Sequence, residues 1–230
     1  MWNKGLSYRE RHGLGQVGMN KDTNSNVGDA LNADTNKSHA VNTDENAPKH
    51  SLGLVFFPAF DWKISETHPE RQERLLYTRD QIVEEGLLDI PNIKEYNPIV
   101  ADWDTIERVH VGAPDLESWV TEAHRVSAGG AIAAADAVMR GEVDRAFALV
   151  RPPGHHAMAM VHGIRGFCTI NIEAVMIQHM RQTYGIKRVA VVDTDVHHGD
   201  GSQDVFYHDP DTLYISFHQD GRTLYPGTGF

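Results

Sequence analysis

Short apolar runs alternate with longer amphipathic stretches in the part of the chain that follows residue 50. Three of these runs are almost wholly apolar: Leu52–Phe57, Ala146–Val150 and Val189–Val192. Runs of this length and composition predict strands that are buried on both faces, as in parallel sheets. Leu213–Phe217 is predicted to be a further strand.

The stretches between these runs predict helices. The first helix is expected from Thr67 to about Glu85, because Glu70 lies three residues after Thr67 as in a capping box. The next elements are a helix over 117–139, a helix over 171–184, and a turn or short helix over 201–207. Gly129 and Gly130 each weaken the second helix by about 1 kcal/mol unless another element packs closely there.

Strands alternate with helices through short connections, and this order predicts an α/β fold. We expect a parallel β-sheet with helices on both faces. Residues 99–111 contain a short element that the pattern does not assign. Residues 1–50 are predicted to be a disordered polar tail, because 20–46 holds almost no large apolar side chains. Residues 51–230 are predicted to be the folded part.

Composition restricts the class of partner. The formal net charge of −11 argues against nonspecific nucleic-acid binding. Neither a membrane-spanning run nor a signal peptide is predicted. The single cysteine, Cys168, excludes an internal disulfide framework and fits the reducing cytoplasm. We therefore expect a cytoplasmic protein, and its acidity weakly favours a cationic substrate; its oligomeric state stays open.

The richest chemistry follows the strand at 189–192, in the segment Asp193–Gly201 (DTDVHHGDG). Ligand sites in open α/β sheets lie just beyond the carboxyl ends of the strands. Asp195 and His197 are two residues apart, so on extended backbone their side chains point to the same side. A carboxylate and an imidazole aimed at one point suit a divalent metal such as zinc.

A histidine pair, His155 and His156, follows the strand at 146–150 after Arg151-Pro-Pro-Gly. The pair is expected at the same edge of the sheet as Asp195 and His197. Imidazole titrates near neutral pH, so two of them beside a metal could move protons to and from reacting groups. A second pair of metal ligands and a purely structural pair remain alternatives.

These motifs resemble the signature of the zinc-dependent histone deacetylase and acetylpolyamine amidohydrolase superfamily, and the class II members in particular. The resemblance covers roughly residues 51–230. It rests on the matching segments RPPGHHA at 151–157, GFC at 166–168, DTDVHHGDG at 193–201 and LYPGTG at 224–229, with HPER at 68–71 as an early motif.

The resemblance implies an arginase-like α/β fold that hydrolyses N-acetyl amides of lysine or polyamines. Asp195 and His197 would then be metal ligands, for Zn²⁺ or alternatively Fe²⁺. His155 and His156 would act as general base and general acid. The carboxylates of Asp193 and Asp200 would orient the two imidazoles.

Further roles follow from the same resemblance. Gly166, Phe167 and Tyr225 would line the tunnel for the acylated substrate, and Cys168 would be a buried packing residue. A structural K⁺ ion would be held by Asp193, Asp195, His197, Ser216 and Phe217.

The sequence also departs from the family. The third metal ligand, an aspartate, and an oxyanion-binding tyrosine would both lie beyond Phe230. We therefore expect the amino-terminal part of a longer product, with weak folding and negligible activity on its own. In the family, a loop near 112–119 often carries an aspartate that binds the substrate backbone, and Asp115 is the only candidate for it in this stretch. The alternatives are a noncatalytic acyl-lysine-binding fold and, less favoured, an arginase-like ureohydrolase.

Overall fold

The computed structural model describes residues 50–60, 62–112, 119–160 and 163–230, without the side chains of 119–121. The chain divides near residue 45, and all of these residues belong to the unit Asn46–Phe230. Residues 1–49 of the predicted tail and Asp115 lie outside the described residues.

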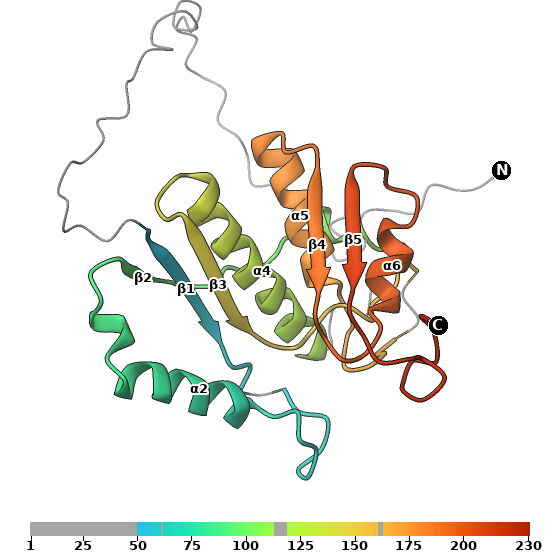
Figure 1. The fold of residues 1–230 in the computed structure, drawn as a ribbon, viewed down its shortest axis with the longest axis horizontal. Helices are drawn as coiled ribbons and strands as arrows, with labels where there is room; N and C mark the ends of the chain where they lie inside the picture. The colour runs from blue at the N-terminus through green and yellow to red at the C-terminus, as the bar shows by residue number, and fades with distance from the viewer. Residues whose placement is uncertain (1–49, 61, 113–118, 161–162) are drawn as a thin grey trace, which may run out of the picture. The chain divides into compact units, whose positions relative to one another are not determined.

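The strands form two parallel sheets. The first has the order β2-β1-β3, with β1 at Leu52–Phe57, β2 at Ile93–Tyr96 and β3 at Arg145–Val150. The second pairs β4, Val189–Asp193, with β5, Thr212–Ser216. Figure 1 shows β1, β3, β4 and β5 running in the same direction, so that the loops after them gather at one edge. The α/β class and the parallel pairing are as predicted, whereas β2 was not predicted.

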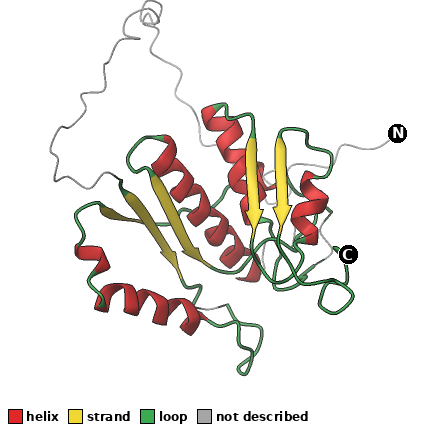
Figure 2. Ribbon diagram, in the orientation of Figure 1, coloured by secondary structure: helices red, strands yellow, loops and turns green. Residues whose placement is uncertain are grey.

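Helices lie against both faces of β1. Figure 2 shows α4 and α5 behind the strands. Val55 of β1 packs on that side against Ala133 and Ala134 of α4. Its neighbour Phe56 has the guanidinium of Arg79, from α2, 5.3 Å from its ring centroid. The helices are α2 Gln72–Glu84, η1 Leu87–Asp89, α3 Trp103–Ile106, α4 Trp119–Met139, α5 Ile172–Tyr184 and α6 Asp200–Phe206.

The helix predicted from Thr67 begins later, at Gln72, and the expected capping box does not form. The amide N–H of Glu70 donates instead to Nδ1 of His68 (3.0 Å). The Glu70 carboxylate accepts a 2.8 Å bond from the buried Arg151, 81 residues away. Glu70 therefore pairs with Arg151 instead of forming the capping box with Thr67.

The two glycines of α4 lie where other atoms come close, backbone at Gly129 and a side chain at Gly130. A Cβ on Gly129 would lie 1.9 Å from the carbonyl oxygen of Ile99, and one on Gly130 would lie 2.6 Å from Val150 Cγ1. The close packing that would offset their poor helix propensity is thus present.

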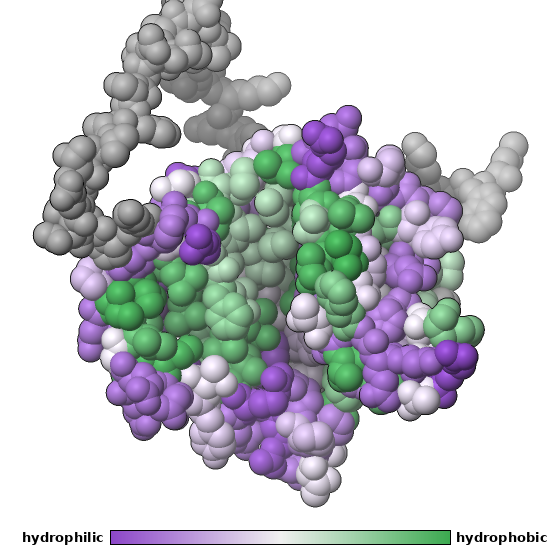
Figure 3. Space-filling model, in the orientation of Figure 1, coloured by the Kyte–Doolittle hydropathy of each residue, from purple (hydrophilic) through white to green (hydrophobic). Residues whose placement is uncertain are grey.

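The core lies between α4, α5 and one face of the strands. Val189 and Val191 of β4 pack there, against a cluster that includes Val175 and Ile177 of α5. The other face of β4 and β5 is exposed, with Val192 at 55% and Leu213 at 60% exposure. Figure 3 shows apolar residues gathered on this side of the molecule, with a hollow between two groups. The prediction that the strand at 189–192 is buried on both faces is therefore wrong, because no described element covers the second face.

None of the helices formed by the described residues is long and apolar enough to span a membrane.

Candidate active site

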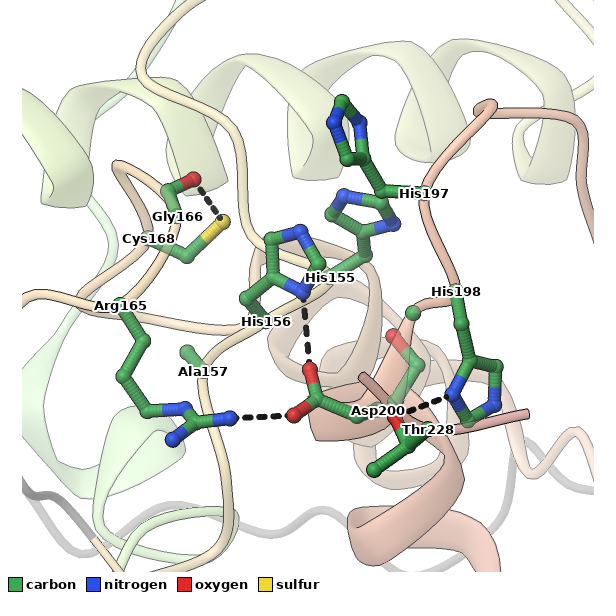
Figure 4. Close-up of polar contacts among 12 residues, drawn as sticks. His155, His156, Ala157, Arg165, Gly166, Cys168, His197, His198, Asp200 and Thr228 are labelled. Carbon is green, nitrogen blue, oxygen red and sulfur yellow. Dashed lines mark hydrogen bonds and ion pairs between the residues drawn. The ribbon is translucent and has the colours of Figure 1, made fainter. Parts of the chain in front are cut away.

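The loops after β3, β4 and β5 bring the predicted site residues together. The rings of His155 and His156 lie 4.1 Å apart between centroids, and the ring of His197 is 6.1 Å from that of His156. Figure 4 shows the three imidazoles side by side, with Asp200 below His156. Parallel strands that end at a common edge explain how segments about 40 residues apart in sequence meet here.

His155 is held by Asp193. Its Nδ1 lies 2.9 Å from Oδ2 of the aspartate, and the hydroxyl of Tyr214 donates to the same oxygen at 2.7 Å. Burial by itself lowers the pKa of His155, but the hydrogen bond and the charge of Asp193 outweigh it and raise the pKa. Burial raises the pKa of Asp193, yet the bonds from His155 and Tyr214 bring it below its usual value.

His156 is held in the same way by Asp200. Its Nδ1 lies 2.8 Å from Oδ1 of the aspartate, and Arg165 forms an ion pair with the other carboxylate oxygen. Burial raises the pKa of Asp200, but the His156 hydrogen bond and the Arg165 charge lower it overall. Each imidazole therefore has its own carboxylate at Nδ1, which fixes the ring orientation.

Asp195 and His197 face one another. Oδ1 of Asp195 accepts the backbone N–H of His197 (2.8 Å) and lies 2.9 Å from Nδ1 of its ring. In tetrahedral coordination, ligand atoms about 2.0–2.1 Å from zinc lie roughly 3.3 Å apart. Both side chains are partly exposed, so a cation could reach them. The pair fits two corners of a zinc site.

The described residues contain no group of three or more His, Cys, Asp or Glu side chains that could hold a metal ion. Within the described part of the chain, the predicted ligands Asp195 and His197 are therefore a pair without a third such residue.

Two aromatic residues predicted to flank the tunnel lie near the histidines. The ring of Tyr225 is 5.0 Å from that of His156 and 6.3 Å from that of His197. Phe167 has a positive φ of 70°, and its ring packs edge-on against His68 at 4.8 Å. Gly166 passes so close to His156 that an added Cβ would lie 2.2 Å from Cδ2 of the ring. These contacts place Tyr225 and Gly166 against His156, whereas the ring of Phe167, the residue after Gly166, packs against His68.

Cys168 is fully buried, and burial raises the pKa of its thiol well above the usual value. Its Sγ contacts the carbonyl oxygen of Gly166 at 3.4 Å. A buried thiol with a raised pKa is a poor nucleophile, which agrees with a packing role.

The residues expected to hold K⁺ lie at the ends of β4 and β5. Asp193 is opposite Ser216 in the sheet, and the N–H of Phe217 donates to the carbonyl oxygen of Asp193 (2.9 Å). Asp195 donates its backbone N–H to Oδ1 of Asp193 at 3.1 Å. Asp193, Ser216 and Phe217 are thus adjacent, and Asp195 and His197 follow in the loop.

Sequence reasoning missed Arg165, Tyr214 and Glu173. Tyr214 lies in β5 and packs against the core, so the order of apolar and polar residues predicts only a packing role for it. Arg165 carries no local signal, because its partner Asp200 is 35 residues away. Glu173 lies in the first turn of α5 and lines a cavity of about 490 Å³ together with His155, Asp193 and Asp195. Burial raises the pKa of Glu173.

Known proteins resemble this chain in sequence. The sequence profile of the histone deacetylase domain matches residues 115–230. A probable deacetylase of Archaeoglobus fulgidus is 40% identical over 197 residues, covering 77% of this chain and 54% of the relative. Another, from Methanothermobacter thermautotrophicus, is 50% identical over 196 residues, covering 77% of this chain and 57% of the relative.

The likeness extends to three dimensions. A crystal structure of the HDA15 HD domain superposes with a TM-score of 0.67 at 30% identity, covering 78% of this chain and 57% of the other. The chain spans about half the length of the curated relatives that it matches. On the profile match, the relatives and the shared fold, the chain belongs to the histone deacetylase family.

Proposed function

We propose that the protein hydrolyses N-acetyl amides, of acetyl-lysine or of acetylpolyamines, by metal-assisted attack of water. The observation that carries this proposal is the paired arrangement of His155 and His156. Each has its Nδ1 occupied by a separate carboxylate, and both lie beside the Asp195–His197 pair. That arrangement leaves Nε2 of each ring as the nitrogen for proton transfer.

The chain's own residues supply the acid–base chemistry. Asp193 accepts the Nδ1 proton of His155 and so favours the tautomer whose Nε2 can take a proton from water. The raised pKa of His155 makes it a stronger base. As His155 takes that proton, the water oxygen bonds to the acetamide carbon. His156, oriented by Asp200 and acting as an imidazolium, then donates its Nε2 proton to the departing amine as the amide C–N bond breaks.

Asp195 and His197 would hold the metal, and the facing carboxylate and imidazole suit Zn²⁺ or Fe²⁺. When bound, the cation would polarise the acetamide carbonyl and acidify the attacking water. Catalytic zinc generally has three protein ligands. We therefore propose that these 230 residues alone bind zinc weakly and turn over substrate negligibly.

We also propose that Asp193, Asp195, His197, Ser216 and Phe217 enclose a structural K⁺ ion. The contact of Phe217 with the Asp193 carbonyl and the pairing of Ser216 with Asp193 support this proposal. Raising the K⁺ concentration at constant ionic strength should raise the unfolding midpoint, whereas Na⁺ should do so less. An identical response to the two ions would contradict it.

Acetate release tests the proposed reaction. The protein, in the full form that its gene encodes, is incubated with zinc and either an acetyl-lysine peptide or N-acetylspermidine. We expect acetate from at least one substrate and loss of most of that activity in Asp195→Ala and His197→Ala.

A noncatalytic acyl-lysine-binding fold is the second candidate, because the described residues supply two metal ligands rather than three. Zinc binding and peptide binding without acetate release would favour it. Urea release from arginine or agmatine would instead indicate a ureohydrolase, a chemistry for which the His155–His156 pair offers no support.

A further inference from the structure

His198, the neighbour of His197, is buried at 3% exposure and uses both ring nitrogens. Its Nδ1 hydrogen-bonds Oγ1 of Thr228 (2.8 Å), a contact that Figure 4 shows. Its Nε2 hydrogen-bonds Oε1 of Gln203 in α6, also at 2.8 Å. His198 therefore links the loop after β5 to a helix of the fold.

His218 adds a second link to the same segment. Its ring lies 4.5 Å from that of His198, tilted by 43°. Its Nδ1 hydrogen-bonds Oγ of Ser216 at the end of β5, and its Nε2 hydrogen-bonds the carbonyl oxygen of Gly229 (2.9 Å). His198 thus links Thr228 to α6, and His218 links Gly229 to the end of β5.

The contacts of the two histidines with residues 228 and 229 leave no room for a side chain at Gly229. A Cβ on Gly229 would lie 2.3 Å from Nε2 of His218 and 2.7 Å from Cγ of His198. On the other side of the loop, a Cβ on Gly221 would lie 1.9 Å from the carbonyl oxygen of Thr228. The loop over 221–229 is therefore closed on itself at Thr228, and the two histidines hold it at that point.

Tyr225 lies within this closed loop, and its ring is 5.0 Å from that of His156. The side chain is half exposed, at 46%. It contacts the rings of His156 and His197 and the backbone of Gly166. The backbone from which it projects is fastened at residues 228 and 229.

We propose that His198 and His218 are positioning residues, which fasten the loop so that Tyr225 forms a wall of the substrate site beside His156. The proposal rests on the proposed function for the identity of the substrate, an acylated amine. An apolar ring could fill the same volume as His198, but it would provide neither of the two hydrogen bonds. The hydrogen bonds, rather than the volume, are what the proposal requires.

The test compares His198→Phe, which keeps a ring but removes both hydrogen bonds, with Thr228→Val, which is close in size and lacks the hydroxyl. Arg222→Ala is the matched control, because Arg222 pairs with Asp220 in the same loop and does not contact either histidine in the described contacts. Proteins labelled with 3-fluorotyrosine are observed by fluorine NMR, and Tyr225→Phe assigns the Tyr225 resonance. Hydrogen exchange of residues 221–229 is measured in parallel, without metal or substrate.

We expect both variants to shift the Tyr225 resonance. Thr228→Val should accelerate exchange in the loop about fivefold, the factor for one lost hydrogen bond of ordinary net strength, and His198→Phe, which removes two bonds, should accelerate it at least as much. The double variant should exchange no faster than His198→Phe alone, since the two changes remove the same bond. If His198→Phe fails to fold, Thr228→Val alone decides the matter. An unmoved resonance with unchanged exchange in Thr228→Val would overturn the proposal.

A substrate measurement separates this proposal from the proposed function. Thr228→Val should raise KM for the acetylated substrate several-fold and leave kcat within about twofold, because the wall contacts substrate but not the reacting atoms. A shifted Tyr225 resonance in a protein that never releases acetate would support the positioning role and refute the deacetylase reaction. A shifted resonance with kcat lowered and KM unchanged would overturn the assignment of Tyr225 as a substrate wall.

Discussion

At the scale of single residues, each site histidine bonds to an aspartate, and the two aspartates differ in their second partner. Asp193 is shared between His155 and the neutral hydroxyl of Tyr214, whereas Asp200 is shared between His156 and the cationic Arg165. The negative charge of Asp193 therefore acts on His155 without a neighbouring arginine in contact. This difference supports the assignment of His155 as the base.

Tyr214→Phe should weaken the fold. The change removes a 2.7 Å donor to a half-buried carboxylate, a loss that costs about 1–3 kcal/mol. Burial and Asp193 both raise the pKa of Tyr214, so its hydroxyl stays protonated and donates throughout the neutral range. Urea unfolding measures the loss. Tyr207→Phe is the control, because Tyr207 is 72% exposed. Equal effects of the two changes would contradict the role given to Tyr214.

Arg165→Met should destabilise the fold in a pH-dependent manner. The folded-state pKa of Asp200 is lowered, so the stability it contributes is present above the unfolded pKa and lost as pH falls through the folded one. Because Arg165 is a third exposed and solvent screens the pair, we expect a loss of about 1 kcal/mol at pH 7. The difference from wild type should shrink below about pH 4. Urea unfolding at both pH values measures this, and a difference that is constant with pH would contradict the ion-pair account.

At the scale of elements, close contacts at two glycines, rather than helix propensity, fix the position of α4. Gly129 faces the carbonyl of Ile99, and Gly130 faces Val150 at the end of β3, the strand that leads into the histidine pair. The position of α4 therefore bears on the position of His155 and His156.

Gly129→Ala should destabilise the protein although alanine favours helix by about 1 kcal/mol. The new methyl group would lie 1.9 Å from a backbone oxygen, which cannot rotate away as a side chain can. We expect a net loss of about 2 kcal/mol or more, as for other overpacked sites. Thermal unfolding measures it, with the exposed Arg140→Ala at the end of α4 as the control. A stabilised Gly129→Ala variant would show that the helix does not approach Ile99 in solution.

The elements also show what the sequence could predict and why. The helix at 171–184 was predictable because its signals are local: the Asn171 side chain caps it, and Gly185 ends it with a φ of 68°. The meeting of the His155–His156 segment with the loop after β4 was predictable because both lie at the carboxyl ends of strands in one parallel fold, whereas the bond between His155 and Asp193 was expected only from the family resemblance. The start of α2 was not, because Glu70 bonds to Arg151 far along the chain. Tyr214 and Arg165 likewise take their roles from distant partners.

At the scale of the whole molecule, the described part of the chain exposes an apolar sheet face. Phe147 of β3 is 52% exposed, and Val192, Leu213 and Phe217 are each more than half exposed. Apolar patches of this kind promote association or bind other surfaces.

The 230-residue chain should therefore bind a hydrophobic fluorescent dye and scatter more light as its concentration rises. Leu213→Lys should reduce both signals, because it places a charge within the exposed face. Tyr207→Lys, which adds the same charge just after α6, is the control. Equal reductions in the two variants would show that net charge, rather than the sheet face, governs association.

The loops after two strands bring a pair of imidazoles beside the proposed metal ligands Asp195 and His197. The rate of acetate release, with and without His156→Ala, tests whether this pair carries the acid–base chemistry. We expect the variant to retain its zinc content and to lose about a hundredfold or more in rate, the usual contribution of a positioned acid–base group. An undiminished rate in His156→Ala with zinc still bound would contradict the account.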